Sequence, residues 1–231
     1  MTLVYVPGLA SDARVWRPVA ERVGGAFVIA DVSGPERITD MAEGVLAQAA
    51  GSVIPVGHSM GGRVAMEMAR IAPERMRGLV LADTGYRPLG PGEAEKRLAK
   101  VALGHRDMEA LVADWLPPMV DPGRHGDTAL MDDLREMILA AGPDQHARQI
   151  RALIGRPDAG ASLGDVTCPV LLLVGATDGW APRAQHEEIA DLVAGPAKVV
   201  EVAGAGHFLP VEKPDETAAA IADWLNRHRL R

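Results

Sequence analysis

Cysteine is nearly absent from this chain of 231 residues, which holds Cys168 and no second cysteine. A disulfide within the chain is therefore excluded, and so are the paired cysteine spacings that hold structural zinc. We expect no metal site built on cysteine pairs.

Basic clusters and long apolar runs are lacking as well. The formal net charge is -7, and neither an acidic tail nor a Lys/Arg cluster is present, so nucleic acid is not an expected partner. No apolar run approaches the roughly 20 residues that a membrane span needs. The chain begins MTLVYVPG, without the basic segment that opens a secretory signal. We expect a cytoplasmic protein that does not associate with membranes.

Short apolar runs alternate with helical patterns along most of the chain. Such runs are typical of strands buried on both faces of a parallel sheet. Their alternation with helices predicts right-handed crossovers and a doubly wound α/β fold with six parallel strands. The predicted strands are residues 3–6, 27–31, 53–56, 79–82, 170–174 and 199–202, and the predicted helices between them are 37–50, 61–71, 183–192 and 215–229.

The alternation stops between residues 86 and 164. This interval has no strand pattern, and its amphipathic stretches over 94–103, 107–115 and 130–140 are separated by proline and glycine. We predict a helical insertion after the fourth strand, residues 86–164, and a core formed by residues 1–85 and 165–231.

The segment Gly57-His58-Ser59-Met60-Gly61 fits the pattern G-x-S-x-G and lies between a predicted strand and a predicted helix. In that context the pattern predicts a sharp turn that strains the serine backbone and exposes its hydroxyl above the sheet. A larger side chain at either glycine would collide with the neighbouring strand or helix. An ordinary tight turn also uses small residues, but the position between strand and helix favours a nucleophile at Ser59.

A serine hydroxyl needs a base within hydrogen-bond reach before it can act as a nucleophile. His207 is the best candidate among the seven histidines, because the glycine-rich segment AGAGHFLP follows the last predicted strand. That position lies at the same sheet edge as Ser59. His58 adjoins the nucleophile, and we expect it either to line the pocket or to pack beneath it.

The base in turn needs an acid, for which the sequence offers two candidates. Asp178 directly follows the fifth predicted strand and is the preferred acid; Asp83 follows the fourth and is the alternative. Both loops open at the same edge of the sheet. An ionised carboxylate there would select the imidazole tautomer and stabilise the imidazolium that forms when Ser59 loses its proton.

Two backbone N–H groups are candidates for an oxyanion hole. The first strand ends in Pro7-Gly8-Leu9, where Gly8 permits a tight turn and the Leu9 N–H can point toward the nucleophile. The Met60 N–H lies at the start of the helix after Ser59, where the helix dipole also favours negative charge.

With Ser59, Asp178 and His207 in this order and PGL after the first strand, the chain resembles the α/β-hydrolase superfamily, in its serine-nucleophile branch. The resemblance implies a cofactor-independent and metal-free hydrolase with these three catalytic residues, oxyanion donors at Leu9 and Met60, and a lid formed by the insertion. The family usually has two more strands, one of them antiparallel, before the strand that ends in the oxyanion loop. We therefore expect a core that lacks these two strands and has six parallel ones.

The resemblance implies cleavage of an ester-like bond (carboxylic ester, thioester or lactone) of a small acyl substrate through an acyl-serine intermediate. A carbon–carbon bond hydrolase acting on a β-diketone or related carboxylate-bearing substrate, and a ligand receptor of the same fold, remain alternatives. Nothing indicates the oligomeric state. Three arginines, Arg148, Arg151 and Arg156, are candidates for holding a substrate carboxylate, although an exposed helix face also explains them. The substrate-binding candidates are Gly8, His58, Trp180 and Arg151.

Overall fold

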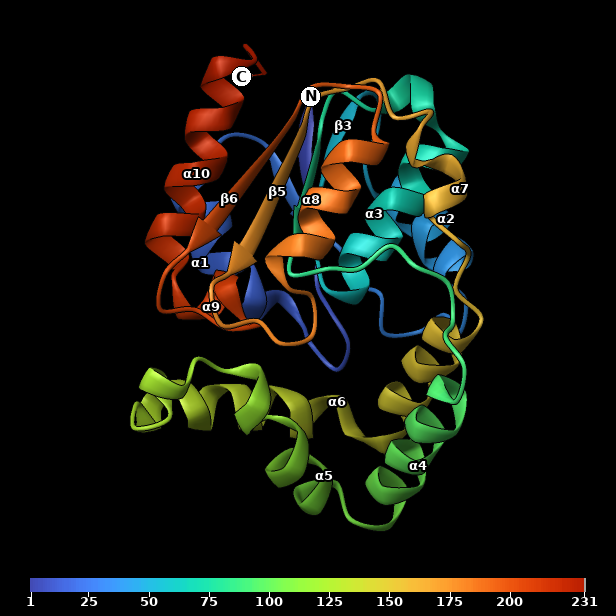
Figure 1. Cartoon of the computed structure of the whole chain (residues 1–231), viewed down its shortest axis with the longest axis vertical. Helices are drawn as coiled ribbons and strands as arrows, with labels where there is room; N and C mark the ends of the chain where they lie inside the picture. The colour runs from blue at the N-terminus through green and yellow to red at the C-terminus, as the bar shows by residue number, and fades with distance from the viewer. Residues whose placement is uncertain (231) are drawn as a thin grey trace.

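Six strands form one parallel sheet in a computed structural model that describes residues 1–230 (Figure 1). The strand order is β2-β1-β3-β4-β5-β6. The chain therefore adds β2 on one side of β1 and then adds β3 to β6 in succession on the other side. The predicted doubly wound, six-stranded parallel sheet is confirmed. The strands are β1 (Thr2–Val6), β2 (Phe27–Ile29), β3 (Val53–His58), β4 (Leu79–Ala82), β5 (Val170–Gly175) and β6 (Ala197–Val202).

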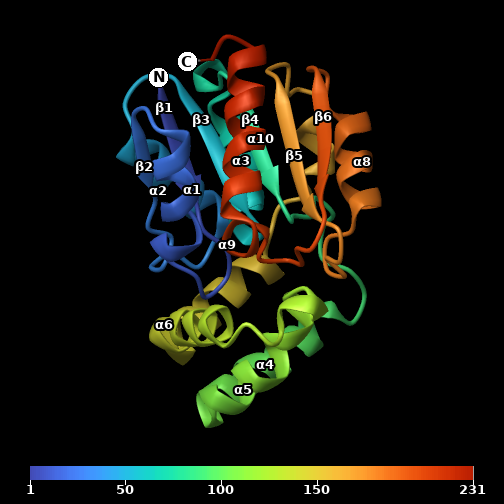
Figure 2. The ribbon, with the colours of Figure 1, turned by 90° about the vertical axis from the view of Figure 1, so that its left-hand side faces the viewer.

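Helices cover both faces of the sheet (Figure 2). Helices α1 (Arg17–Val23) and α10 (Pro214–Arg227) pack on one face, and α2 (Ile38–Gln48), α3 (Met60–Ile71) and α8 (Arg183–Leu192) pack on the other. The direction of winding reverses between β1 and β3. In sheets of this kind, ligands bind beyond the carboxyl ends of the strands at such a reversal.

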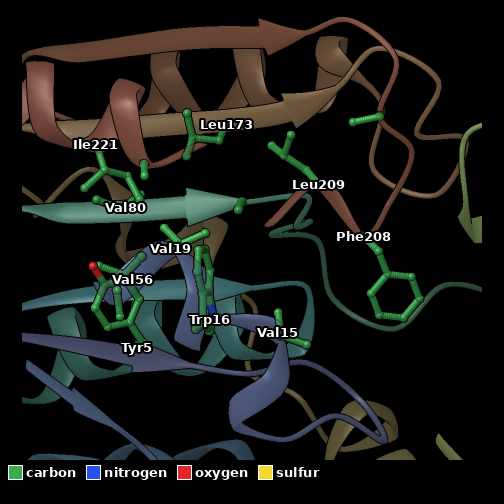
Figure 3. Close-up of a cluster of buried hydrophobic side chains, with 14 of the residues drawn as sticks. Tyr5, Val15, Trp16, Val19, Val56, Val80, Leu173, Phe208, Leu209 and Ile221 are labelled. Carbon is green, nitrogen blue, oxygen red and sulfur yellow. The ribbon is translucent and has the colours of Figure 1, made fainter. Parts of the chain in front are cut away.

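The core divides into two clusters because successive strand residues point to opposite faces of the sheet. On β1, Tyr5 belongs to the cluster under α1 and α10, whereas Val4 belongs to the cluster under α2 and α3. Figure 3 shows the first cluster, in which Trp16 lies beside Tyr5 with ring centroids 5.4 Å apart. The Trp16 indole N–H donates to the Val6 carbonyl at 3.0 Å, which satisfies the only polar atom of this buried side chain.

The predicted insertion, residues 86–164, is helical. Its helices over residues 93–106 and 108–115, with most of the longest helix, lie beyond the carboxyl ends of the strands and away from the two termini, whereas the last helix, Gly160–Leu163, packs beside α3 and α8 (Figure 1). Its longest helix is kinked at Gly142, where φ is 71°. Among the residues described, none of the helices combines the length and apolar character that a bilayer crossing needs. The helices here are α4 (Glu93–Arg106), α5 (Met108–Trp115), α6 (Thr128–Ile154) and α7 (Gly160–Leu163), with short 3-10 turns at Pro117–Met119 and Pro122–Arg124.

One expectation about the core was wrong, and one helix of the core was missed. The edge strands β2 and β6 are not buried on both faces: β2 is half-buried throughout, and β6 exposes Lys198 and Glu201. Charged side chains on an edge strand hinder pairing with another chain. Helix α1 was not predicted, because its seven residues span less than two turns and show little periodicity. Short elements also occur at Ala13–Val15, Pro73–Arg75 and α9 (Leu209–Glu212).

Candidate active site

Ser59 occupies the turn between β3 and α3, at the point where the winding of the sheet reverses. Its backbone has φ 54° and ψ -116°, a left-handed region that residues other than glycine rarely adopt. Two hydrogen bonds hold this conformation: the Ser59 N–H donates to the Ala82 carbonyl at 2.9 Å, and the Thr84 hydroxyl donates to the Ser59 carbonyl at 2.6 Å. Strain of this kind persists where the surrounding structure enforces it.

The two glycines of the turn are required because neighbouring backbone fills the space that a side chain would need. A Cβ atom on Gly57 would overlap the Gly61 carbonyl of α3, and a Cβ atom on Gly61 would overlap the Val6 carbonyl at the end of β1. Both obstacles are backbone atoms, which cannot move without shifting a strand or a helix. The predicted collisions with the neighbouring strand and helix are confirmed.

Replacing Gly61 with alanine is therefore expected to lower the free energy of unfolding by more than about 3 kcal/mol, since the added methyl group displaces β1 from α3. Gly44→Ala is the matched control: Gly44 lies inside α2 with open space around its Cβ position, so alanine should stabilise the helix by about 0.5–1 kcal/mol. Urea unfolding followed by circular dichroism measures both. Equal stability of Gly61→Ala and the native protein would contradict the packing argument.

His207 joins Ser59 to Asp178 in a line of two hydrogen bonds. The Ser59 hydroxyl donates to His207 Nε2 at 2.8 Å, and His207 Nδ1–H donates to Asp178 Oδ2 at 2.9 Å. The other oxygen, Asp178 Oδ1, accepts from the Trp180 and Ala181 N–H groups at 2.8 and 3.0 Å. Burial alone would raise the pKa of Asp178, but the charge of His207 and these hydrogen bonds outweigh it and lower the pKa below its ordinary value.

The alternative acid, Asp83, is directed to other partners. Its two oxygens accept from the Gly175 N–H at 2.9 Å and the Leu209 N–H at 3.2 Å. Burial, followed by the nearby charge of Asp178, raises the pKa of Asp83 well above its ordinary value. Of the two candidate carboxylates, Asp178 is the one that contacts the His207 imidazole.

His58 lies beneath the segment that carries His207. Its Nε2–H donates to the His207 carbonyl at 2.6 Å, and its ring centroid lies 5.7 Å from that of Phe208. Burial lowers the pKa of His58 to about 3, so the imidazole is neutral near pH 7. Its contact with a substrate stays a prediction.

The predicted oxyanion donors lie at the ends of two adjacent strands. Leu9 follows β1 and Met60 opens α3 after β3; within residues 1–230, neither N–H has a protein acceptor. Gly8 brings the loop after β1 close to the turn, because a Cβ atom there would lie 3.2 Å from Ser59 Cβ. Both N–H groups are therefore available to a ligand atom.

Gln149 contacts the loop after β1 from the insertion and was missed in the sequence. It is fully buried on α6, where its Oε1 accepts from the Ala10 N–H at 2.7 Å and its Nε2 donates to the Val32 carbonyl at 3.3 Å. Ala10 has φ 50°, so this contact supports a strained residue beside Leu9. No local pattern marks a glutamine that acts on segments so distant in the chain.

The remaining substrate-binding candidates, Trp180 and Arg151, differ in their surroundings. Trp180 is 52% exposed, and its ring centroid lies 6.5 Å from that of His207. Arg151 forms an ion pair with Glu36 at 2.8 Å, and its contact with a substrate stays a prediction. The other two arginines also have protein partners: Arg148 donates to the Ser33 carbonyl, and Arg156 pairs with Glu93.

The arrangement combines a hydroxyl, an imidazole and a carboxylate with two free N–H groups, which are the parts that acyl transfer requires. Within residues 1–230, no group of three or more His, Cys, Asp or Glu side chains is placed to hold a metal ion. Residues 3–220 match the alpha/beta hydrolase family. The chain belongs to this family. The match covers the sheet and the insertion, and the resemblance seen in the sequence is confirmed.

This alpha/beta hydrolase resembles proteins that carry several different names. A pimeloyl-[acyl-carrier protein] methyl ester esterase from Edwardsiella ictaluri is 25% identical over 97% of this chain and 93% of its own length. Polyketide synthase ThaQ from Burkholderia thailandensis is 31% identical over 76% of this chain, which spans only 9% of ThaQ. The structure of a thermophilic esterase from Thermogutta terrifontis with bound malate superposes with a TM-score of 0.88 and 26% identity, over 99% of this chain and 90% of the esterase.

Proposed function

We propose that this chain is a serine hydrolase that cleaves an ester-like bond of a small molecule through an acyl-serine intermediate. One observation carries the proposal: the hydrogen bonds that link Ser59 Oγ to His207 Nε2 and His207 Nδ1 to Asp178, at 2.8 and 2.9 Å. They align a proton donor, a base and an orienting acid at the carboxyl edge of the sheet.

In the first step, Ser59 Oγ attacks the substrate carbonyl and its proton passes to His207 Nε2. Asp178 accepts a hydrogen bond from Nδ1, so the tautomer that leaves the Nε2 lone pair free is the favoured one. The lowered pKa of Asp178 keeps its carboxylate ionised, which stabilises the imidazolium that forms.

The carbonyl oxygen becomes an oxyanion during this attack, and the Leu9 and Met60 N–H groups are its proposed donors. Met60 opens a helix of 12 residues, so the helix dipole adds to the stabilisation of negative charge. Both donors are held before the substrate arrives, which avoids reorganisation during the reaction.

Collapse of the tetrahedral intermediate breaks the bond to the leaving group, which takes the proton from His207 Nε2. The acyl group is left as an ester on Ser59. A water molecule then attacks this ester while His207 accepts its proton, and the second collapse returns that proton to Ser59 Oγ and releases the acid.

The substrate proposed is a small carboxylic ester, thioester or lactone that binds between the sheet edge and the insertion, residues 86–164, which acts as a lid. The names of the similar esterases support ester chemistry. Trp180, half exposed beside His207, supplies an apolar surface for the acyl or leaving group.

Covalent labelling tests the proposal directly. A fluorophosphonate is expected to add once to the protein, at Ser59, and to abolish hydrolysis of p-nitrophenyl butyrate in proportion to labelling; peptide mass spectrometry locates the adduct. A label on another residue, or full activity after complete labelling, would refute the assignment.

A substrate panel separates the proposed reaction from its alternatives. Esters, thioesters and lactones are expected to have higher kcat/KM values than β-diketones; the reverse order would indicate a carbon–carbon bond hydrolase. A thermal shift by these compounds without sustained turnover would indicate a ligand receptor.

A further inference from the structure

Glu212 is a buried acid whose side chain is held by backbone N–H groups. It lies at the end of α9, the short helix after His207, and is 3% exposed. Its Oε1 accepts from the N–H groups of Gly206 and Phe208 at 2.9 and 3.2 Å, and its Oε2 accepts from the Asp121 N–H at 2.8 Å. Burial raises the pKa of this carboxyl, whereas the three N–H groups oppose the rise. A carboxylate in such a place is costly unless it is fully hydrogen-bonded.

Two of the three N–H groups flank His207 in the chain. The carboxylate therefore restrains the backbone on both sides of the imidazole that faces Ser59. The His207 peptide groups are restrained as well: its N–H donates to the Met119 carbonyl at 2.7 Å, and its carbonyl accepts from His58 Nε2–H at 2.6 Å. The His207 backbone cannot shift without breaking one of these hydrogen bonds.

The third N–H group belongs to the insertion. Asp121 lies two residues after Met119, so Glu212 and His207 are bound to the same short segment of the insertion. Gly206 permits this close approach, because a Cβ atom there would lie 2.8 Å from both Asp121 N and the Met119 carbonyl oxygen. Thr177, beside Asp178, adds a hydrogen bond to Asp121 Oδ2 at 2.9 Å.

We propose that Glu212 is a positioning residue: it holds His207 Nε2 within reach of Ser59 Oγ by fixing the Gly206 and Phe208 amides to the insertion at Asp121. It does not touch the reacting atoms. The inference rests on the proposed function, in which His207 is the base. A displacement of the base by about 1 Å can lower the rate by roughly 100-fold, so the hydrogen bonds that fix the His207 backbone affect turnover directly.

Glu212→Gln is the test variant, because glutamine keeps the shape but replaces one acceptor oxygen with an NH2 group that faces a backbone N–H. We expect kcat for p-nitrophenyl butyrate to fall by roughly 10- to 100-fold while KM changes by less than about threefold. The rate of Ser59 phosphonylation should fall by the same factor, since it needs the same base but no ester binding. Both rates are expressed per folded molecule, as measured by circular dichroism.

Glu67→Gln is the matched control. Glu67, on α3, is also a buried glutamate, 4% exposed, but it binds Thr39 of α2 and Arg70 of α3, outside the active site. Its replacement should lower the melting temperature and leave kcat and the phosphonylation rate within about twofold of the native values. If Glu212→Gln does not fold, Glu212→Asp, which keeps the charge but is too short to reach all three amides, takes its place with the same expected loss.

Native kcat and phosphonylation rates in the Glu212 variant would overturn the inference, and so would equal losses in the Glu212 and Glu67 variants. Failure of the proposed function is distinguishable: the native protein would then not be labelled at Ser59. Labelling of the native protein at Ser59, together with an unchanged rate in Glu212→Gln, would refute the role of Glu212 alone.

Discussion

Ser59→Ala protein is expected to hydrolyse p-nitrophenyl esters with a kcat lower by roughly 10⁶-fold than that of the native enzyme. Alanine removes the oxygen that attacks the carbonyl and that would carry the acyl group. The residual rate would come from a reaction in which water replaces serine as the nucleophile and the two oxyanion donors still stabilise the oxyanion. Steady-state assays with each purified variant measure the loss, and circular dichroism shows whether the fold is kept.

Ser162→Ala is the matched control for this variant. Ser162 lies on α7 in the insertion, and its hydroxyl donates only to the Ala159 carbonyl at 3.3 Å. Its loss should leave kcat within about twofold of the native value, because an exposed or half-buried hydroxyl contributes little. A Ser59→Ala enzyme that keeps more than about a hundredth of the native rate would contradict the acyl-serine mechanism.

Asp178→Asn should lower kcat by about 10⁴-fold with little change in KM. The amide NH2 group would donate to His207 Nδ1, which selects the tautomer with the proton on Nε2. That nitrogen could then no longer accept the proton of Ser59, and the charge that stabilises the imidazolium would be lost. The measurement is kcat and KM for p-nitrophenyl butyrate at several pH values.

Asp83→Asn is the comparison variant that distinguishes the two candidate acids. Both aspartates are buried and both follow a strand, but Asp83 binds the Gly175 and Leu209 amides. Asparagine places its NH2 group against one of these N–H groups, so the variant should be less stable. Its kcat, per folded molecule, should stay within about tenfold of the native value. A larger loss for Asp83→Asn than for Asp178→Asn would make Asp83 the acid.

Much of the architecture was predictable because it depends on local patterns. Buried parallel strands are short apolar runs, and the helices between them have a different period, so the six strands were located within three residues at either end. The edge strands were the exception. The sequence of β6 has enough apolar residues to suggest burial on both faces. How much of the strand is buried, however, depends on which neighbouring elements cover it.

Candidate site residues were predictable for a topological reason. The carboxyl ends of parallel strands meet at one edge of the sheet, so residues directly after strands are brought together whatever their separation in the chain. Ser59, Leu9 and His207 were selected by this argument. Gln149 and Glu212 lie on helices and accept hydrogen bonds from backbone groups far away in the chain, at Ala10 and Asp121, which no periodicity in the sequence can predict.

The sequence by itself determined the fold, the edge at which the polar residues gather and the turn that Ser59 requires, because each follows from local periodicity or from steric limits on glycine. It favoured Asp178 as the acid that faces His207 but kept Asp83 as the alternative. Only the tertiary structure decided that question, because the direction of a carboxylate depends on which backbone amides and imidazole nitrogens surround it after the loops have packed.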